Sequence, residues 1–318
     1  MKAFVFPGQG SQYIGMGREL HDTFSSAKEV FQEVDDVLDQ KLSKLMFSGD
    51  EADLKLTHNT QPALMAVSLA IMRILEKDMG VELVKTAGFV AGHSLGEYSA
   101  LCAAGVYSLA ATTRLLRIRG NAMQKAVPAG KGGMAALIGA TLEQAEVLSK
   151  EASQGASLCE IANDNAPGQV VLSGHMDAIE RALELAQDKE RGIKRAILLP
   201  VSAPFHSSLM GPAAERMKDA LGNEKIQALP SVTLISNVTA TPLETREQLT
   251  QRLVDQITGR VRWVESMTYL AEQGLSEIIE VGAGKVLTGL MRRINKDVSA
   301  MSLETPADID AFCQKLAA

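Results

Sequence analysis

The feature that most constrains the fold is a five-residue turn, Gly92-His93-Ser94-Leu95-Gly96. A short apolar segment at 87–91 precedes it, and a helix rich in small residues is expected to begin near Glu97. Small residues around a serine permit a strained turn from a strand into a helix, which exposes the hydroxyl above a sheet. The next N–H group then lies at a helix N-terminus, where negative charge is stabilised. The pattern predicts an α/β fold in which Ser94 is a nucleophile.

A second constraint comes from the middle of the chain, where strands and helices are short and closely spaced. We expect, in order, a strand, a helix, two strands, a helix and a strand, at 134–138, 142–153, 158–162, 169–173, 176–188 and 195–200. This βαββαβ order is the split βαβ motif. Alternating strand and helix patterns occur both before and after this segment. The sequence therefore predicts a large α/β domain made of residues 1–127 and 200–318, with residues 128–199 inserted as a small α+β subdomain.

A serine hydroxyl becomes a strong nucleophile only when a base accepts its proton. Among the histidines that follow Ser94, His175 falls at the start of an expected helix, where a capping role is the simpler interpretation. His206 follows the strand that returns to the large domain. The nearby acids upstream of His206, such as Asp164, Asp177 and Asp188, all fall in the inserted segment, so no third member of a triad is visible in the usual chain order. We predict a Ser94–His206 dyad that a backbone carbonyl orients.

One cation is expected to point into the core. When residues 114–126 are drawn as a helix at about 100° per residue, Arg119 falls in the middle of the apolar side. That side consists of Leu115, Leu116, Ala122, Met123 and Ala126. A buried guanidinium needs a carboxylate, because an unpaired buried charge is strongly destabilising. The carboxylate comes either from the protein, as a structural ion pair, or from a substrate that the arginine binds through two hydrogen bonds.

Composition excludes several classes of protein. The chain has 318 residues, a net charge of −6 and 4% aromatic residues, which argues against nucleic-acid binding. The charge-free stretch at 98–113 is too short and too polar for a membrane span, and the N-terminus lacks a signal-peptide core. The cysteines, at 102, 159 and 313, are widely spaced, so we expect no metal site and a reducing, cytoplasmic location. Glycine-rich segments at 8–10 and 282–285 lack the full nucleotide-binding patterns, so no cofactor is predicted.

A series of short motifs occurs in one order along the chain. They are Phe6-Pro7-Gly8-Gln9-Gly10-Ser11-Gln12, Thr60-Gln61-Pro62-Ala63-Leu64, Gly92-His93-Ser94-Leu95-Gly96-Glu97-Tyr98, Arg119-Gly120, Asn165-Ala166-Pro167-Gly168-Gln169, Phe205-His206 and Glu280-Val281-Gly282. Together they resemble the malonyl-CoA:acyl-carrier-protein transacylases of bacterial fatty acid synthesis, from residue 3 to about residue 294. The resemblance implies a hydrolase-like domain with a parallel sheet and an inserted ferredoxin-like subdomain.

The resemblance also implies a ping-pong acyl transfer by a monomeric enzyme without metal or cofactor. Malonyl-CoA would acylate Ser94, and the phosphopantetheine thiol of acyl carrier protein would then take the malonyl group, with His206 as base and acid. Arg119 would hold the malonyl carboxylate. The remaining implied groups are the oxyanion-hole N–H groups of Gln12 and Leu95, the acyl-pocket side chains of Met123 and Phe205, and the carbonyl of Arg262 that orients the histidine.

Three alternatives remain open at this stage. The enzyme could load malonyl onto a different carrier, it could be a serine esterase whose acyl-enzyme reacts with water, or it could be a binding scaffold whose serine is never acylated. If the partner is an acidic carrier protein, it must dock on a local basic surface, because the enzyme is itself acidic. Two candidate patches are Arg191, Lys194 and Arg195, and Lys285, Arg292, Arg293 and Lys296.

Overall fold

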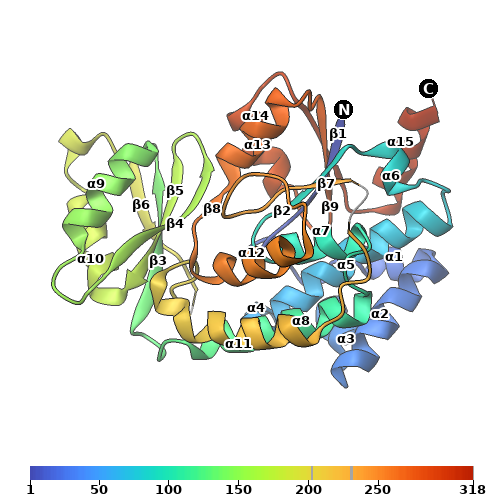
Figure 1. Cartoon of the computed structure of the whole chain (residues 1–318), viewed down its shortest axis with the longest axis horizontal. Helices are drawn as coiled ribbons and strands as arrows, with labels where there is room; N and C mark the ends of the chain where they lie inside the picture. The colour runs from blue at the N-terminus through green and yellow to red at the C-terminus, as the bar shows by residue number, and fades with distance from the viewer. Residues whose placement is uncertain (202, 230–231, 318) are drawn as a thin grey trace.

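The computed structural model describes residues 1–201, 203–229 and 232–317 (Figure 1). Within these ranges the chain forms two five-stranded sheets. The first is parallel throughout and has the strand order β10-β9-β1-β2-β7. Its strands are β1 (Lys2–Phe6), β2 (Phe89–Gly92), β7 (Thr233–Leu234), β9 (Glu277–Val281) and β10 (Ser299–Leu303). Strands from both ends of the chain therefore pair side by side, which confirms the predicted α/β class.

Alternate residues of β1 face two different helical layers, as the period of a strand requires. Phe4 and Phe6 belong to a core shared with α2 (Ser25–Leu38), α5 (Thr57–Lys77), α7 (Leu95–Ala103) and α8 (Leu109–Lys125). Ala3 and Val5 belong to a second core, shared with α13 (Trp263–Glu272) and α14 (Val286–Ile294). Helices thus cover both faces, and the strands can be apolar along their whole length.

The second sheet, at the left of Figure 1, has the order β6-β3-β5-β4-β8. Its strands are β3 (Gly132–Ile138), β4 (Cys159–Ala166), β5 (Gln169–His175), β6 (Arg195–Leu198) and β8 (Val261–Arg262). The first four pair antiparallel, and α9 (Leu142–Ala152) and α10 (Met176–Leu185) pack on them in a core of their own. β8 pairs parallel to β4 and comes from far outside the segment that the sequence marks as inserted.

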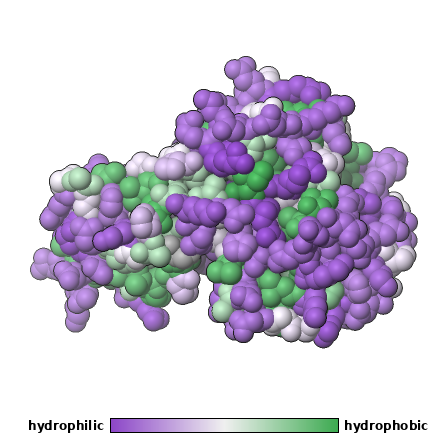
Figure 2. Space-filling view, turned by 90° about the horizontal axis from the view of Figure 1, so that it is seen from below, coloured by the Kyte–Doolittle hydropathy of each residue, from purple (hydrophilic) through white to green (hydrophobic). Residues whose placement is uncertain are grey.

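The remaining helices complete the larger lobe and the connections. They are α1 (Arg18–Thr23), α3 (Leu42–Ser48), α4 (Glu51–Lys55), α6 (Leu83–Thr86), α11 (Gly211–Asn223), α12 (Arg246–Thr258), α15 (Pro306–Ala317) and the 3-10 turns η1 (Lys189–Arg191) and η2 (Ser208–Met210). Seen from below, the surface shows the smaller lobe set off from the larger by a notch (Figure 2). Within the described ranges no helix is long and apolar enough to span a membrane.

The parallel sheet brings two functional turns together. Phe6 at the end of β1 is in register with Gly92 at the end of β2, so the turns that follow them start side by side. The N–H of His93 donates to the carbonyl of Phe6 at 3.0 Å and ties the turns to each other. Ligand sites in parallel sheets lie outside the carboxyl ends of the strands, and both turns occupy that edge.

Candidate active site

Ser94 occupies a strained turn between β2 and α7. Its φ of +53° and ψ of −111° lie outside the regions that side chains ordinarily adopt. A Cβ at Gly92 would lie 1.9 Å from the Gly96 carbonyl oxygen, and one at Gly96 would lie 2.2 Å from the Phe6 oxygen. Both flanking glycines are therefore required sterically. The turn presents the Ser94 hydroxyl beyond the sheet edge, with the N–H of Leu95 in the first turn of α7, as the sequence predicts.

The structure brings His206 into contact with Ser94. The Ser94 Oγ and the His206 Nε2 are 2.8 Å apart, and His206 Nδ1 is 2.9 Å from the carbonyl oxygen of Gln256. Because a carbonyl only accepts, the Nδ1 carries the proton and the Nε2 offers a lone pair to the hydroxyl. The dyad therefore has the tautomer that a general base needs.

The carbonyl that orients His206 belongs to Gln256, and the expectation of Arg262 is wrong. Gln256 lies in the last turn of α12, where helix carbonyls have no partner within the helix. Its free oxygen is thus available to the imidazole. Arg262 instead forms β8, and its carbonyl accepts from the Ser266 hydroxyl at 2.8 Å in the first turn of α13.

Burial and a neighbouring cation keep His206 neutral. The side chain is 4% exposed, and burial, with the positive charge of Arg119, lowers its pKa to about 3. Each effect disfavours the imidazolium form. At neutral pH the base is therefore unprotonated and ready to accept the Ser94 proton.

Arg119 reaches the same hydroxyl from α8. Its side chain is 1% exposed, and its Nη2 donates to Ser94 Oγ at 3.0 Å and to Gln256 Oε1 at 2.8 Å. The guanidinium carbon lies 5.5 Å from the centre of the Tyr98 ring. Among the described residues the Nε has no hydrogen-bond partner, and no carboxylate lies within the 4.0 Å of an ion pair. Of the two options for Arg119, the structural ion pair is therefore not formed.

These groups line a cavity of about 160 Å³ between the two sheets. Met123 and Phe205 line it, as expected of acyl-pocket residues, and so does Leu95. The expected Gln12 does not, and Gln9 takes its place. The positive φ of Gly10 turns the chain after Gln9, and the Gln12 side chain folds back to accept from the Gly10 N–H at 2.7 Å.

Two residues of the site carry no signal in the sequence analysis. Asn237 accepts from the Ser94 N–H at 2.7 Å and donates to the Gly92 carbonyl at 2.6 Å, so it clamps the strained turn. Gln256 bonds Ser94, His206 and Arg119 at once. The signal that could have found Gln256 is Gly259, which ends α12 and so leaves the carbonyls of its last turn without partners in the helix.

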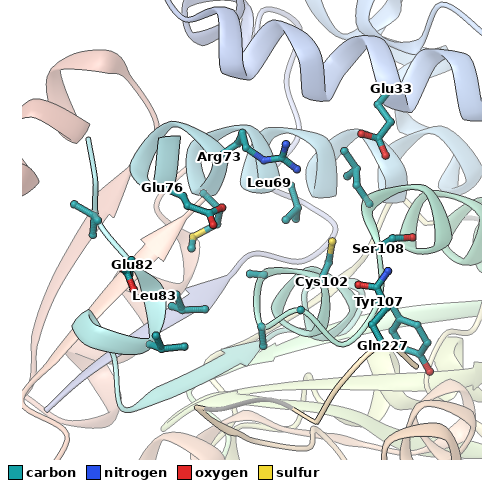
Figure 3. A pocket seen from close by; sticks show the side chains of 17 residues that line it. Glu33, Leu69, Arg73, Glu76, Glu82, Leu83, Cys102, Tyr107, Ser108 and Gln227 are labelled. Atoms are coloured by element: carbon teal, nitrogen blue, oxygen red, sulfur yellow. The ribbon is translucent and has the colours of Figure 1, made fainter. Parts of the chain in front are cut away.

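A larger cavity, of about 540 Å³, lies between α2, α5 and α7 (Figure 3). Arg73, Glu33 and Cys102 line it, whereas Ser94 and His206 do not. Although this cavity is the larger of the two, it is therefore not the site of the Ser94–His206 dyad. Among the described residues no group of three or more His, Cys, Asp or Glu side chains is placed to hold a metal ion.

Known acyl transferases resemble this chain in sequence. Residues 3–307 match the family model described as acyl transferase domain. The chain belongs to this acyl transferase family. It is 44% identical to the malonyl CoA-acyl carrier protein transacylase of Bacillus subtilis strain 168, over 99% of this chain and 96% of that protein.

Solved structures extend the likeness of this acyl transferase to the whole fold. The acyl-carrier-protein-S-malonyltransferase of Bartonella henselae has a TM-score of 0.96 and 53% identity, covering 100% of this chain and 99% of that one. A malonyl-transacylase solved in complex with a type II PKS acyl-carrier protein has a TM-score of 0.94 and 39% identity, with 99% of each chain covered. The predicted fold, a hydrolase-like parallel-sheet domain with a ferredoxin-like subdomain, is thereby confirmed.

The low pKa of His206 predicts how the reactivity of Ser94 depends on pH. Labelling of Ser94 by a neutral fluorophosphonate should stay constant from about pH 7 down to about pH 5, because the base remains unprotonated. The unfolded chain binds a proton at His206 near its ordinary pKa of 6.5 and the folded chain does not, so the free energy of unfolding falls as the pH drops. Circular dichroism must therefore confirm folding at each pH. A labelling rate that halves near pH 6.5 would show that the base has the pKa of an ordinary histidine, and it would contradict the prediction.

Proposed function

We propose that this enzyme moves a malonyl group from malonyl-CoA to the phosphopantetheine thiol of acyl carrier protein, through an ester on Ser94. One observation carries the proposal. The guanidinium of Arg119 lies 3.0 Å from the nucleophile, buried, with no carboxylate partner among the described residues. A substrate whose acyl group ends in a carboxylate supplies the missing anion at the right distance from the reacting carbon. The names of the similar proteins agree with this substrate and this carrier.

The first half-reaction acylates the enzyme. Ser94 gives its proton to Nε2 of His206 while Oγ attacks the thioester carbonyl. The oxyanion of the tetrahedral intermediate is stabilised by N–H groups, for which we propose Leu95 and, in place of Gln12, Gln9. When the C–S bond breaks, His206 returns the proton to the sulfur and CoA leaves as a thiol.

The second half-reaction reverses these steps with a new thiol. The phosphopantetheine thiol gives its proton to His206 and attacks the ester carbonyl, and Ser94 leaves as a hydroxyl by recovering that proton. The malonyl group passes from a thioester to the Ser94 ester and then to a second thioester. These bonds differ little in energy, so the transfer needs no separate energy source. The carbonyl of Gln256 holds the imidazole in place through both halves.

Arg119 accounts for substrate choice in this scheme. A malonyl carboxylate would pair with the guanidinium, whereas an acetyl group would leave the buried cation without an anion. An active site strongly rejects a substrate that leaves one of its buried polar groups unpaired. Met123 and Phe205, which line the small cavity, would limit the length of the acyl chain. We assign both to the substrate pocket.

We extend the proposal to the organisation of the chain. Residues 1–127 and 200–318 form the catalytic domain, and residues 128–199 form a subdomain, supported by the separate core of α9, α10 and their strands. We also propose a monomer, because the Ser94–His206 dyad, Arg119 and the cavity they line are complete within a single copy of the chain. The free thiols of Cys102, Cys159 and Cys313 support a cytoplasmic location.

For the carrier we propose one docking surface, in which the two candidate patches meet. Arg293 donates to Pro167 O at 2.8 Å and to Gln169 Oε1 at 2.6 Å, at the turn between β4 and β5. Gly168 of this turn accepts from the Gly139 N–H at 2.8 Å, and the Lys194 side chain packs against Gly139. The combined basic surface consists of Lys194, Arg195, Lys285, Arg292, Arg293 and Lys296.

Two observations favour this surface. None of its six cations forms an ion pair with a described residue, although the whole chain carries a net charge of −6, whereas Arg191 is paired with Glu151 at 2.6 Å. In addition, β4 leads directly into the turn between β4 and β5, and its residues Asn163 and Asn165 line the cavity of about 160 Å³. An acidic carrier bound there would lie next to the site that its thiol must reach.

Mass spectrometry tests the proposed intermediate. Wild-type enzyme mixed with malonyl-CoA should gain the mass of one malonyl group, and Ser94→Ala should gain none. His206→Ala should acylate about 10²-fold more slowly, in the usual range for a general base. A malonyl adduct that persists in Ser94→Ala would contradict the assignment, and rapid loss of the adduct in water without carrier would favour the esterase.

Charge reversal tests the docking surface. Lys194→Glu combined with Arg292→Glu should raise KM for acyl carrier protein by about tenfold at low salt, and high salt should reduce the effect. Acylation by malonyl-CoA should stay unchanged. Lys41→Glu with Lys44→Glu makes the same change of net charge near the start of α3, on the opposite side of the molecule (Figure 1). If both pairs raise KM equally, or neither does, the proposed surface is wrong.

A further inference from the structure

Behind the dyad lies a carboxyl group that no step of the mechanism uses. Glu97, in the first turn of α7, is fully buried, and its Oε1 has no hydrogen-bond partner among the described residues. Its Oε2 accepts from Gln256 Nε2 at 2.6 Å and from the Asn237 N–H at 3.4 Å. Both of these partners hold reactive parts of the site. A buried carboxyl is costly, so its place behind the nucleophile calls for a function.

The Gln256 amide stands between Glu97 and Arg119. Its Oε1 accepts from Arg119 Nη2 at 2.8 Å, and its Nε2 donates to Glu97 Oε2 and, at 2.9 Å, to the Ser94 carbonyl. An amide has one accepting and one donating end, so these partners allow it a single orientation. Were the amide to flip, its NH₂ group would face the guanidinium and its oxygen would face two acceptors.

We propose that Glu97 is a positioning residue that acts through the Gln256 amide to hold the Arg119 guanidinium where it meets the carboxylate of the acyl group. The inference rests on the proposed function and deepens it, because it names the residues that set substrate choice. Glu97 touches neither substrate nor reacting atoms. Its removal releases the amide, and the amide then no longer fixes the cation.

The protonation of Glu97 suits this function. Burial raises the pKa of its carboxyl to about 8, against the smaller opposing effects of Gln256, Asn237 and Arg119. A neutral carboxyl still accepts through its carbonyl oxygen. A glutamine at 97 has the same shape and the same accepting oxygen, whereas a leucine has neither acceptor nor donor.

The dyad and the carboxylate clamp can be measured separately. The main-chain carbonyl of Gln256, which orients His206, is not altered by a side-chain substitution at 97. A neutral fluorophosphonate brings no carboxylate for Arg119 to hold, so labelling of Ser94 by this reagent reports on the nucleophile and its base rather than on the carboxylate clamp. The selectivity ratio, which we define as the acylation rate with malonyl-CoA divided by the rate with acetyl-CoA, reports on Arg119.

The test compares Glu97→Leu, Glu97→Met and Glu97→Gln with the wild type. We expect Glu97→Leu and Glu97→Met, which both lack an acceptor for the Gln256 amide, to lower the selectivity ratio by about tenfold or more while fluorophosphonate labelling stays within about threefold of the wild type. Glu97→Gln should restore a ratio within about threefold of the wild type, because it keeps the acceptor. If Glu97→Leu does not fold, the other two variants decide.

Glu280 offers a matched control. It is fully buried in β9, its carboxyl accepts from the N–H groups of Leu287 and Thr288 at 2.9 and 2.7 Å, and it does not line the cavity of the dyad. Glu280→Gln should lower the melting temperature and leave the selectivity ratio unchanged. An unchanged ratio in both Glu97→Leu and Glu97→Met, or an equal loss of ratio and labelling, would overturn the inference. Failure of the wild type to be acylated by malonyl-CoA would instead overturn the proposed function.

Discussion

A guanidinium buried beside the nucleophile, without an anion of its own, is the constraint on which the rest of the site depends. Removing a charge from water costs several kcal/mol even after the protein relaxes. Arg119 recovers part of this through the Tyr98 ring, the Ser94 hydroxyl and the Gln256 amide, all neutral groups. In the proposed mechanism a substrate carboxylate recovers the rest, and the enzyme therefore prefers acyl groups that end in a carboxylate.

In the proposed mechanism the same cation also supports catalysis. Its positive charge helps to keep His206 unprotonated, and its Nη2 leaves the Ser94 hydrogen free to point to the imidazole. Helix ends supply the other fixed charges, since the N-terminus of α7 faces the nucleophile and the C-terminus of α12 faces the imidazole. The side chains of Arg119 and His206 are buried, and shielding from water strengthens their interactions.

Much of this arrangement could be predicted because its signals are local. The turn around Ser94 carries its own glycines, and the apolar side of one helix sufficed to identify Arg119 as a buried cation. The parts that could not be predicted depend on contacts distant in sequence. Gln256 lies 162 residues from Ser94, and the two-residue strand β8 is too short to have a pattern. Whether Gln9 or Gln12, in the turn after β1, faces the cavity depends on the positive φ of Gly10.

The most direct test of the account is the acyl preference of Arg119→Ala, measured as initial rates of Ser94 acylation with malonyl-CoA and with acetyl-CoA. With the cation gone, acylation by malonyl-CoA should fall by about 10²-fold or more, while acetyl-CoA, which needs no anion partner, should gain relative to it until the preference is lost. An enzyme that lacks Arg119 and still prefers malonyl-CoA as strongly as the wild type would contradict the account.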